Sequence, residues 1–176
     1  MQSITILIAK ISRYCLLTSV SCLLALTTIA QEENERWLLG TGVTYCSYIN
    51  NPGINLNVTY RLIGNLHIGP DFSALLTHED NENGRQVKRK ELEYNINAQQ
   101  LFEVKERLAL YPIVGINWSK VTIHPEDEDP DVRWITAFNA GGGIEWKFKS
   151  VRLFLESKWV SRLNKYDITT GILFPL

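Results

Sequence analysis

The amino-acid sequence predicts an all-β fold, an eight-stranded antiparallel up-and-down transmembrane β-barrel. Three observations predict it. Apolar and polar side chains alternate with a period of two in one segment after another beyond residue 36. Tight and longer connections alternate between these segments, and aromatic residues gather near both ends of them. Beyond the first thirty residues, no stretch has the capped 3.6-residue periodicity of a helix.

Residues 1–30 have the features of an export signal. Lys10 and Arg13 form a basic segment, and an apolar run covers residues 14–29. Thr28 and Ala30 then put small residues at positions −3 and −1 before the polar residues 31–35. An uncleaved membrane anchor is the alternative, but the run is shorter and more polar than the roughly 20 apolar residues of a spanning helix. We therefore predict a signal peptide over residues 1–30 and a barrel domain over residues 31–176.

The composition excludes several classes of function. The chain has 18 basic and 19 acidic residues, and without residues 1–30, which hold two basic residues and no acid, its net charge is near −3. This weak acidity predicts neither nucleic-acid binding nor a polybasic membrane patch. Cys15 and Cys22 are removed with the signal, so that only Cys46 remains. By its parity Cys46 faces inward, and we expect it to be a small buried residue. A single cysteine excludes an intramolecular disulfide and a cysteine metal cluster. No cofactor is expected.

Eight strands follow from the alternation, which is clearest over residues 53–62. Some of them are too long for an ordinary globular sheet but suit the tilted staves of a barrel. The predicted strands cover residues 37–48, 54–62, 66–77, 90–104, 108–122, 133–148, 151–161 and 166–176.

The connections between these strands are of two kinds. Those at residues 63–65, 105–107 and 149–150 are tight. Between them lie the longer polar segments 78–86 and 124–131, together with the short segments 50–52 and 162–165. Tight turns at one rim and longer loops at the other are typical of a transmembrane barrel whose long loops lie outside the cell. An even number of strands then brings both chain ends to the short-turn, periplasmic rim.

The apolar face of each strand carries all five tryptophans, close to the strand ends. Such rings form belts at the two lipid–water interfaces of a membrane barrel, because one edge is wet and the other apolar. A soluble core has no reason to place its aromatic residues at both ends. The predicted belts are Trp37, Tyr60, Phe102, Trp146 and Phe174 toward the short-turn rim, and Tyr45, Trp118, Trp134, Trp159 and Tyr166 toward the long-loop rim.

The opposite face carries glycines and long charged side chains. An eight-stranded barrel has little interior room, so such side chains need small residues opposite them. Buried charges are costly unless paired, which predicts an ion-pair network filling the barrel; a pore or proton path is the alternative. An interior of this kind would leave a soluble lipocalin-like barrel, the other eight-stranded possibility, without an apolar cavity. The predicted network consists of Arg61, Glu91, Glu93, Glu103, Glu145, Arg152, Glu156 and Lys158.

The sequence from about residue 37 to residue 176 resembles the OmpA/OmpX-like family of small outer-membrane β-barrel proteins. Residues 110–118, 139–146 and 153–159 look like its fifth, sixth and seventh strands. The last eight residues are similar to the assembly signal of such barrels, carried here by Thr169, Gly171, Phe174 and Leu176. The chain departs from the family pattern in ending on leucine rather than phenylalanine and in having Pro175. The resemblance implies a location in the outer membrane of a Gram-negative bacterium, with membrane lipid and the barrel assembly machinery as partners.

The expected function is that of a monomeric, non-enzymatic outer-membrane barrel with a structural or surface-interaction role, whose extracellular loops carry any specific binding. A narrow pore and a lipid-modifying enzyme remain alternatives. Such an enzyme needs a histidine, a serine and a carboxylate together, and no serine adjoins His67, His78 or His124. His78 and His124 lie near acidic residues of the long loops, which favours a solvated acidic surface over a divalent-cation site.

Overall fold

The computed structural model describes residues 36–82, 85–125 and 129–176. The predicted signal peptide, residues 1–30, lies outside the described residues. Within those residues, no helix has the length and apolar character to cross a membrane. The described chain folds into one sheet of the strands β1 Trp37–Cys46, β2 Asn51–Ile63, β3 Leu66–Leu75, β4 His78–Glu82, β5 Arg85–Gln100, β6 Phe102–Lys105, β7 Leu108–Pro125, β8 Asp131–Lys147, β9 Arg152–Val160 and β10 Lys165–Pro175.

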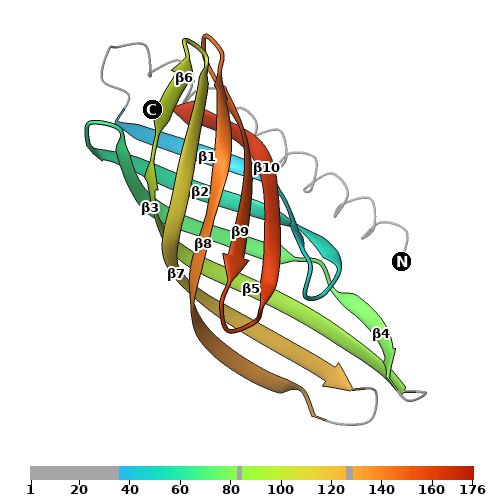
Figure 1. Ribbon diagram of the computed structural model, residues 1–176. Helices are drawn as coiled ribbons and strands as arrows, with labels where there is room; N and C mark the ends of the chain where they lie inside the picture. The colour runs from blue at the N-terminus through green and yellow to red at the C-terminus, as the bar shows by residue number, and fades with distance from the viewer. Residues whose placement is uncertain (1–35, 83–84, 126–128) are drawn as a thin grey trace, which may run out of the picture.

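The sheet closes on itself into an eight-stave antiparallel barrel (Figure 1). β1 pairs with β2 on one side and with β10 on the other, where Leu38 faces Pro175, so the start of β1 and the end of β10 meet at one rim. β3 and β4 both pair with β5 and form one stave. β5 and β6 both pair with β7 and form another. The predicted fold class and number of staves are confirmed.

Two segments predicted as long loops are largely strands. Residues 78–82 form β4 and pair with residues 85–89 at the start of β5, and β7 continues through Pro125 opposite the start of β8 at Asp131. Their side chains are polar on both faces and therefore lack the apolar contrast that marks a strand, but their backbones continue the ladder of neighbouring staves. These four strand ends extend from the barrel at the rim opposite the start of β1 and the end of β10 (Figure 1). We refer to them, the described residues 78–82, 85–90, 120–125 and 129–136, as the extension.

The residues in the tight turns suit the backbone conformations found there. Gly64, in the turn between β2 and β3, has a φ of 54°, which glycine adopts without a Cβ clash. Asn50 and Asn164 lie directly before β2 and β10 in the turns at the other rim, and their φ angles are 50° and 45°. Asparagine tolerates this left-handed conformation better than most residues. Contrary to prediction, Asn51, Pro52 and Lys165 belong to strands rather than to these turns.

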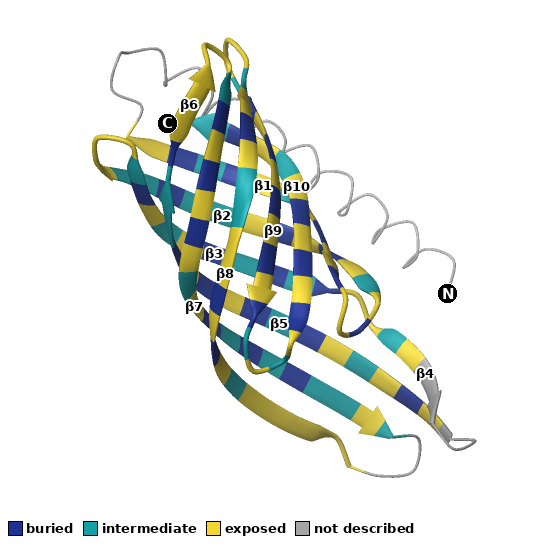
Figure 2. Ribbon diagram, in the orientation of Figure 1, coloured by how far each residue is buried: buried dark blue, intermediate teal, exposed yellow. Residues whose placement is uncertain are grey.

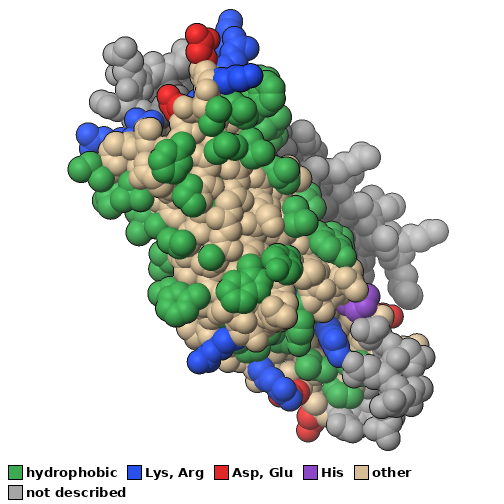
Figure 3. Space-filling model, in the orientation of Figure 1, with side chains coloured by type: hydrophobic (Ala, Val, Ile, Leu, Met, Phe, Trp, Pro, Cys, Tyr) green, Lys and Arg blue, Asp and Glu red, His purple; other side chains and the backbone are tan. Residues whose placement is uncertain are grey.

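Burial alternates along the staves, as Figure 2 shows by its bands of colour. β9 alternates perfectly from buried Arg152 to buried Val160. The residues that face outward are mostly large and apolar, for example Phe138, which is 73 % exposed. Hydrophobic side chains cover the visible outer face in Figure 3, and basic side chains lie beyond them at both ends. The barrel is therefore apolar outside and polar inside, the reverse of a soluble barrel.

Candidate functional site

Lys165 is the centre of the interior near the long-loop rim. Its ammonium group donates hydrogen bonds to Glu91, at 2.7 Å, and to Glu93, and lies 3.7 Å from Asp167. The lysine comes from β10 and the two glutamates from β5, which is four staves away around the eight-stave barrel. The ion pairs therefore cross the full width of the lumen. Cys46 lies beside them and is fully buried, as its parity predicts.

Asp71 is the centre of the middle layer. Its carboxylate accepts hydrogen bonds from Lys158 at 2.6 Å, Asn55 at 3.0 Å and Asn95 at 3.2 Å. Lys158 comes from β9 and Asp71 from β3, which again are opposite staves. Further buried amides join staves in this layer: Asn139 donates to both Asn95 and Asn97. One carboxylate thus accepts hydrogen bonds from several staves, and this favours one register of strand pairing over the others.

Two acids face the interior toward the short-turn rim. Glu156 accepts a hydrogen bond of 3.0 Å from the hydroxyl of Tyr111, and Glu145 accepts one of 2.7 Å from Arg152. These side chains come from β7, β8 and β9. His67 is buried at this end, with Arg61 as its register partner.

The arrangement is a stack of three polar layers, of which the two centred on Lys165 and Asp71 are tied across the lumen. Ionised groups in a water-poor interior interact much more strongly than on the surface, and each pair also satisfies the hydrogen-bonding groups of the other. Such layers can hold the staves in one register and fill the space between them. Most of the polar groups in these layers are bonded to one another rather than exposed to a ligand.

The structure brings most of the predicted network together, but not all of it. Glu91, Glu93, Glu145, Arg152, Glu156 and Lys158 are buried inside the barrel. Arg61 is half-buried at the short-turn end and forms no ion pair with the described residues. Glu103 is a correction, because it is exposed and pairs with Lys147 at 2.5 Å on the rim. β6 extends past the end of the neighbouring strand β3, so Glu103 lies beyond the closed part of the barrel.

Sequence reasoning missed several of the central residues. The sequence pattern predicts Lys165 in a turn, and the predicted network lacks Asp167, although both share the inward parity of Thr169 on β10. Extending the alternation of that strand by one residue would have found them. The buried amides of the middle layer are Asn55, Asn95, Asn97, Asn117 and Asn139. The sequence does not mark them as network residues, since asparagine carries no charge that demands a partner.

Inward glycines make room for these layers, and Gly143 shows how. A Cβ at Gly143 would lie 2.5 Å from the ring of Tyr111, whereas a Cβ at its outward neighbour Gly142 would approach nothing closer than a backbone oxygen at 3.2 Å. We expect Gly143→Val to lower the free energy of unfolding by about 1–3 kcal/mol, because overpacking displaces Tyr111 from Glu156. Gly142→Val, the matched control, should have a clearly smaller effect. Urea titration of the folded barrel measures both, and equal losses would contradict this role of Gly143.

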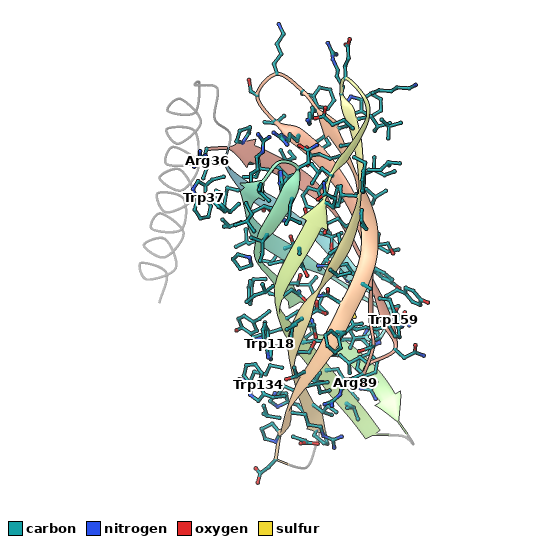
Figure 4. The ribbon with its side chains drawn as sticks, turned by 60° about the vertical axis from the view of Figure 1, so that its left-hand side comes forward. Arg36, Trp37, Arg89, Trp118, Trp134 and Trp159 are labelled. Atoms are coloured by element: carbon teal, nitrogen blue, oxygen red, sulfur yellow. The ribbon has the colours of Figure 1, made fainter. Side chains whose placement is uncertain are left out.

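The structure places the predicted belt residues on the outer surface, toward opposite rims. Figure 4 shows Trp37 near the end where the chain enters the barrel, and Trp118, Trp134 and Trp159 toward the extension. Their polar edges meet the turns: the Tyr45 hydroxyl donates to Asn50, and Trp159 Nε1 donates to Asn164, both at 3.1 Å. Seven of the ten rings are exposed, and Tyr60, Trp118 and Phe174 are half-buried. Contact of these rings with lipid stays a prediction.

The C-terminal strand, with Thr169, Gly171, Phe174 and Leu176, closes the barrel. Thr169 shares a 2.8 Å hydroxyl contact with Thr44 of β1, and the Leu176 backbone N–H donates to the carbonyl of Trp37. A Cβ at Gly171 would lie 2.2 Å from the backbone oxygen of Thr41. The closure thus needs glycine at this position. The recognition of this strand as an assembly signal stays a prediction.

The histidines lie in different regions. His67 is inside near the short-turn rim, and His78 and His124 belong to β4 and β7 of the extension. Glu126 and Asp127, which would complete the predicted cation-binding alternative, lie outside the described residues.

The extension is a polar sheet of four strand ends with two open edges. β4 and residues 131–137 of β8 pair on one side only with described strands. Lys88 donates to Glu79 at 2.8 Å, and this hydrogen bond and charge lower the pKa of Glu79 below its ordinary value. Arg133 similarly pairs with Asp131 at 2.5 Å. Open edges and ionised side chains give this sheet the means to bind other molecules.

Comparison with known proteins identifies the fold. No protein family and no curated protein matches the sequence. Among solved structures, Neisserial surface protein A has a TM-score of 0.62 at 10 % identity, with 80 % of this chain and 97 % of that chain covered. The N-terminal β-barrel domain of Pseudomonas aeruginosa OprF has a TM-score of 0.61 at 11 % identity, covering 82 % and 100 %. Ail of Yersinia pestis, in complex with the heparin analogue sucrose octasulfate, has a TM-score of 0.53 at 16 % identity, covering 78 % and 96 %.

Proposed function

We propose that this chain, which has the fold of the small eight-stranded outer-membrane β-barrels, is an integral outer-membrane protein with a structural or surface-interaction role. One observation carries the proposal: the barrel is apolar on its outside and crossed by ion pairs on its inside. Closure pairs the backbone groups of neighbouring staves, as hydrocarbon demands, and the aromatic rings lie where belts set the depth in the bilayer.

The extension is the surface that we expect to carry specific binding. It lies at the rim opposite the start of β1 and the end of β10, which is the extracellular rim of an exported barrel. Its edges at β4 and β8 and its ionised side chains are accessible beyond the lipid. Ail was solved in complex with a heparin analogue, so a protein of this fold can bind a sulfated sugar.

The alternatives have weaker support. Ion pairs between opposite staves, such as Lys165 with Glu91 and Lys158 with Asp71, obstruct the path that a narrow pore needs. A lipid-modifying enzyme needs a histidine with a serine and a carboxylate, and no serine adjoins a histidine in the sequence, so we propose a non-enzymatic role. A soluble lipocalin-like barrel would bury the apolar residues that lie exposed here.

The proposal includes an assembly route. A barrel with β10 as its closing strand is a substrate for the outer-membrane assembly machinery, and the terminal residues Thr169, Gly171, Phe174 and Leu176 supply the signal for it. The folded barrel has no unpaired edge strand within the membrane and therefore works as a monomer.

Gel mobility of the outer-membrane fraction tests the proposal. We expect the unboiled protein to migrate as a compact band in SDS and to shift on boiling, because a closed barrel resists the detergent in the cold. In intact cells, a membrane-impermeant maleimide should label Gln86→Cys in the extension but not Lys149→Cys at the opposite rim; both positions are exposed, and native Cys46 is buried. A protein that is soluble in the periplasm and shows no shift would contradict the proposal.

A further inference from the structure

Two lysines lie on the outer face of the barrel, just beyond the aromatic belt of the long-loop rim. Lys120 follows Trp118 by two residues on the outward side of β7, about 7 Å further along the strand, where the extension begins. Lys90 lies on the same face of β5, where its register partner is Thr122 and that of Lys120 is Leu92. Such diagonal neighbours are about 7–8 Å apart, so one anionic group can contact both ammonium groups.

The charges of these two lysines are not neutralised. Neither Lys90 nor Lys120 forms an ion pair with the described residues, whereas the nearby Lys88 is already paired with Glu79. The Lys120 ammonium lies 5.9 Å from the centre of the Trp134 ring, a cation–π contact that holds it at the level of the belt. Figure 4 shows Trp134 and Trp118 on the same outer side, toward the extension.

An apolar groove of about 480 Å³ begins directly below the two lysines. Tyr94 and Trp118, which are register partners, lie at its end nearest the lysines. The rings of Phe72 and Trp134 lie 5.1 Å and 6.2 Å from that of Tyr94, so aromatic contacts join the groove to the lysines. The groove continues across β5, β3, β2 and β1, and its outward-facing lining also includes Leu39, Leu56, Val58, Pro70 and Ile96.

We propose that Lys90, Lys120 and this groove bind a phosphorylated, multiply acylated glycolipid of the lipid A type. The lysines contact its phosphate, and an acyl chain lies along the groove. A groove alone accepts any acyl chain, but two unpaired lysines at its headgroup end select an anionic lipid. The net charge of the chain does not predict this site, because acids elsewhere outweigh a local pair of lysines. The inference rests on the proposed function, which places this belt at the outer-leaflet interface and the extension beyond it.

Native mass spectrometry of the full barrel in a neutral detergent tests this site. The probes are diphosphorylated lipid A and the same lipid after removal of its phosphates. A lysine near an anionic headgroup contributes about fivefold in affinity, so Lys90→Gln/Lys120→Gln should weaken binding of diphosphorylated lipid A about 30-fold. Lys105→Gln/Lys149→Gln removes the same charge at the opposite rim, where both lysines are exposed, and should leave binding within about threefold. The dephosphorylated lipid should bind weakly to every variant.

Two outcomes would overturn the site. One is equal binding of the two lipids, and the other is an equal loss in both double variants, which would mean that only overall charge matters. The boiled and unboiled gel mobility of each variant is measured alongside. If the variants remain heat-modifiable barrels but show no phosphate selectivity, the lipid site is wrong while the proposed function stands. If the wild-type protein itself forms no heat-modifiable barrel in the membrane, the proposed function fails.

Discussion

Val114→Arg is expected to destabilise the barrel by about 2–4 kcal/mol in a bilayer, because it puts a charge on the lipid-facing side near the middle of the membrane. Val114 is 59 % exposed and lies outward on β7, between Ala98 of β5 and Ala140 of β8. Apolar side chains surround it in a shallow groove that contains Ile96. An arginine there has no polar partner on the surface and must reach several residues along the stave to find water.

Val104→Arg is the matched control. Val104 has a similar exposure, 54 %, and also faces outward, but it lies on β6 beside the short turn. An arginine at that depth should cost no more than about 1 kcal/mol, because its guanidinium group reaches the interface. Urea titration in phospholipid vesicles, followed by the fraction that resists SDS in the cold, measures both variants. Equal stabilities would mean that the outer face is not in lipid, and the assignment of the two faces would be wrong.

The fold could be predicted from the sequence because the two faces of the barrel differ so strongly in polarity. Along β9, residues from Arg152 to Val160 alternate without exception, and a period of two fixes the strand, its register and its inward face at once. Strand β4, the start of β5 and the end of β7 were not predicted as strands for the converse reason. Polar residues on both faces carry no periodic contrast, and only the neighbouring backbones show that these segments continue the sheet.

The interior was harder to predict than the exterior. Parity identifies which acids point inward, but it does not give the partner of each, since pairs such as Lys158 and Asp71 are 87 residues apart in sequence and join opposite staves. Glu103 shows the limit at a strand end: its parity is inward, yet it lies beyond the wall that would enclose it. The groove below Lys120 depends on five staves together, so no local pattern in the sequence predicts it.

Lys165→Met is expected to have the largest effect of all, a loss of about 3–5 kcal/mol in the free energy of unfolding. The lysine is fully buried and holds two hydrogen-bonded carboxylates, those of Glu91 and Glu93, across the lumen. Methionine fills a similar volume, so packing changes little. Replacing the lysine leaves two buried carboxylates with neither a positive charge nor a hydrogen-bond donor. An unpaired buried charge is far more costly than the loss of a surface ion pair.

Two further variants show whether charge is the cause. Lys147→Met removes the lysine of the rim pair with Glu103, whose carboxylate stays in water, and should cost no more than about 1 kcal/mol. Replacing Glu91 and Glu93 by glutamine in the Lys165→Met background removes the two stranded charges and should recover most of the lost stability. All variants are compared by urea titration in the same vesicles. If the triple variant is as unstable as Lys165→Met, then packing around Lys165, rather than pairing across the lumen, holds this end of the barrel.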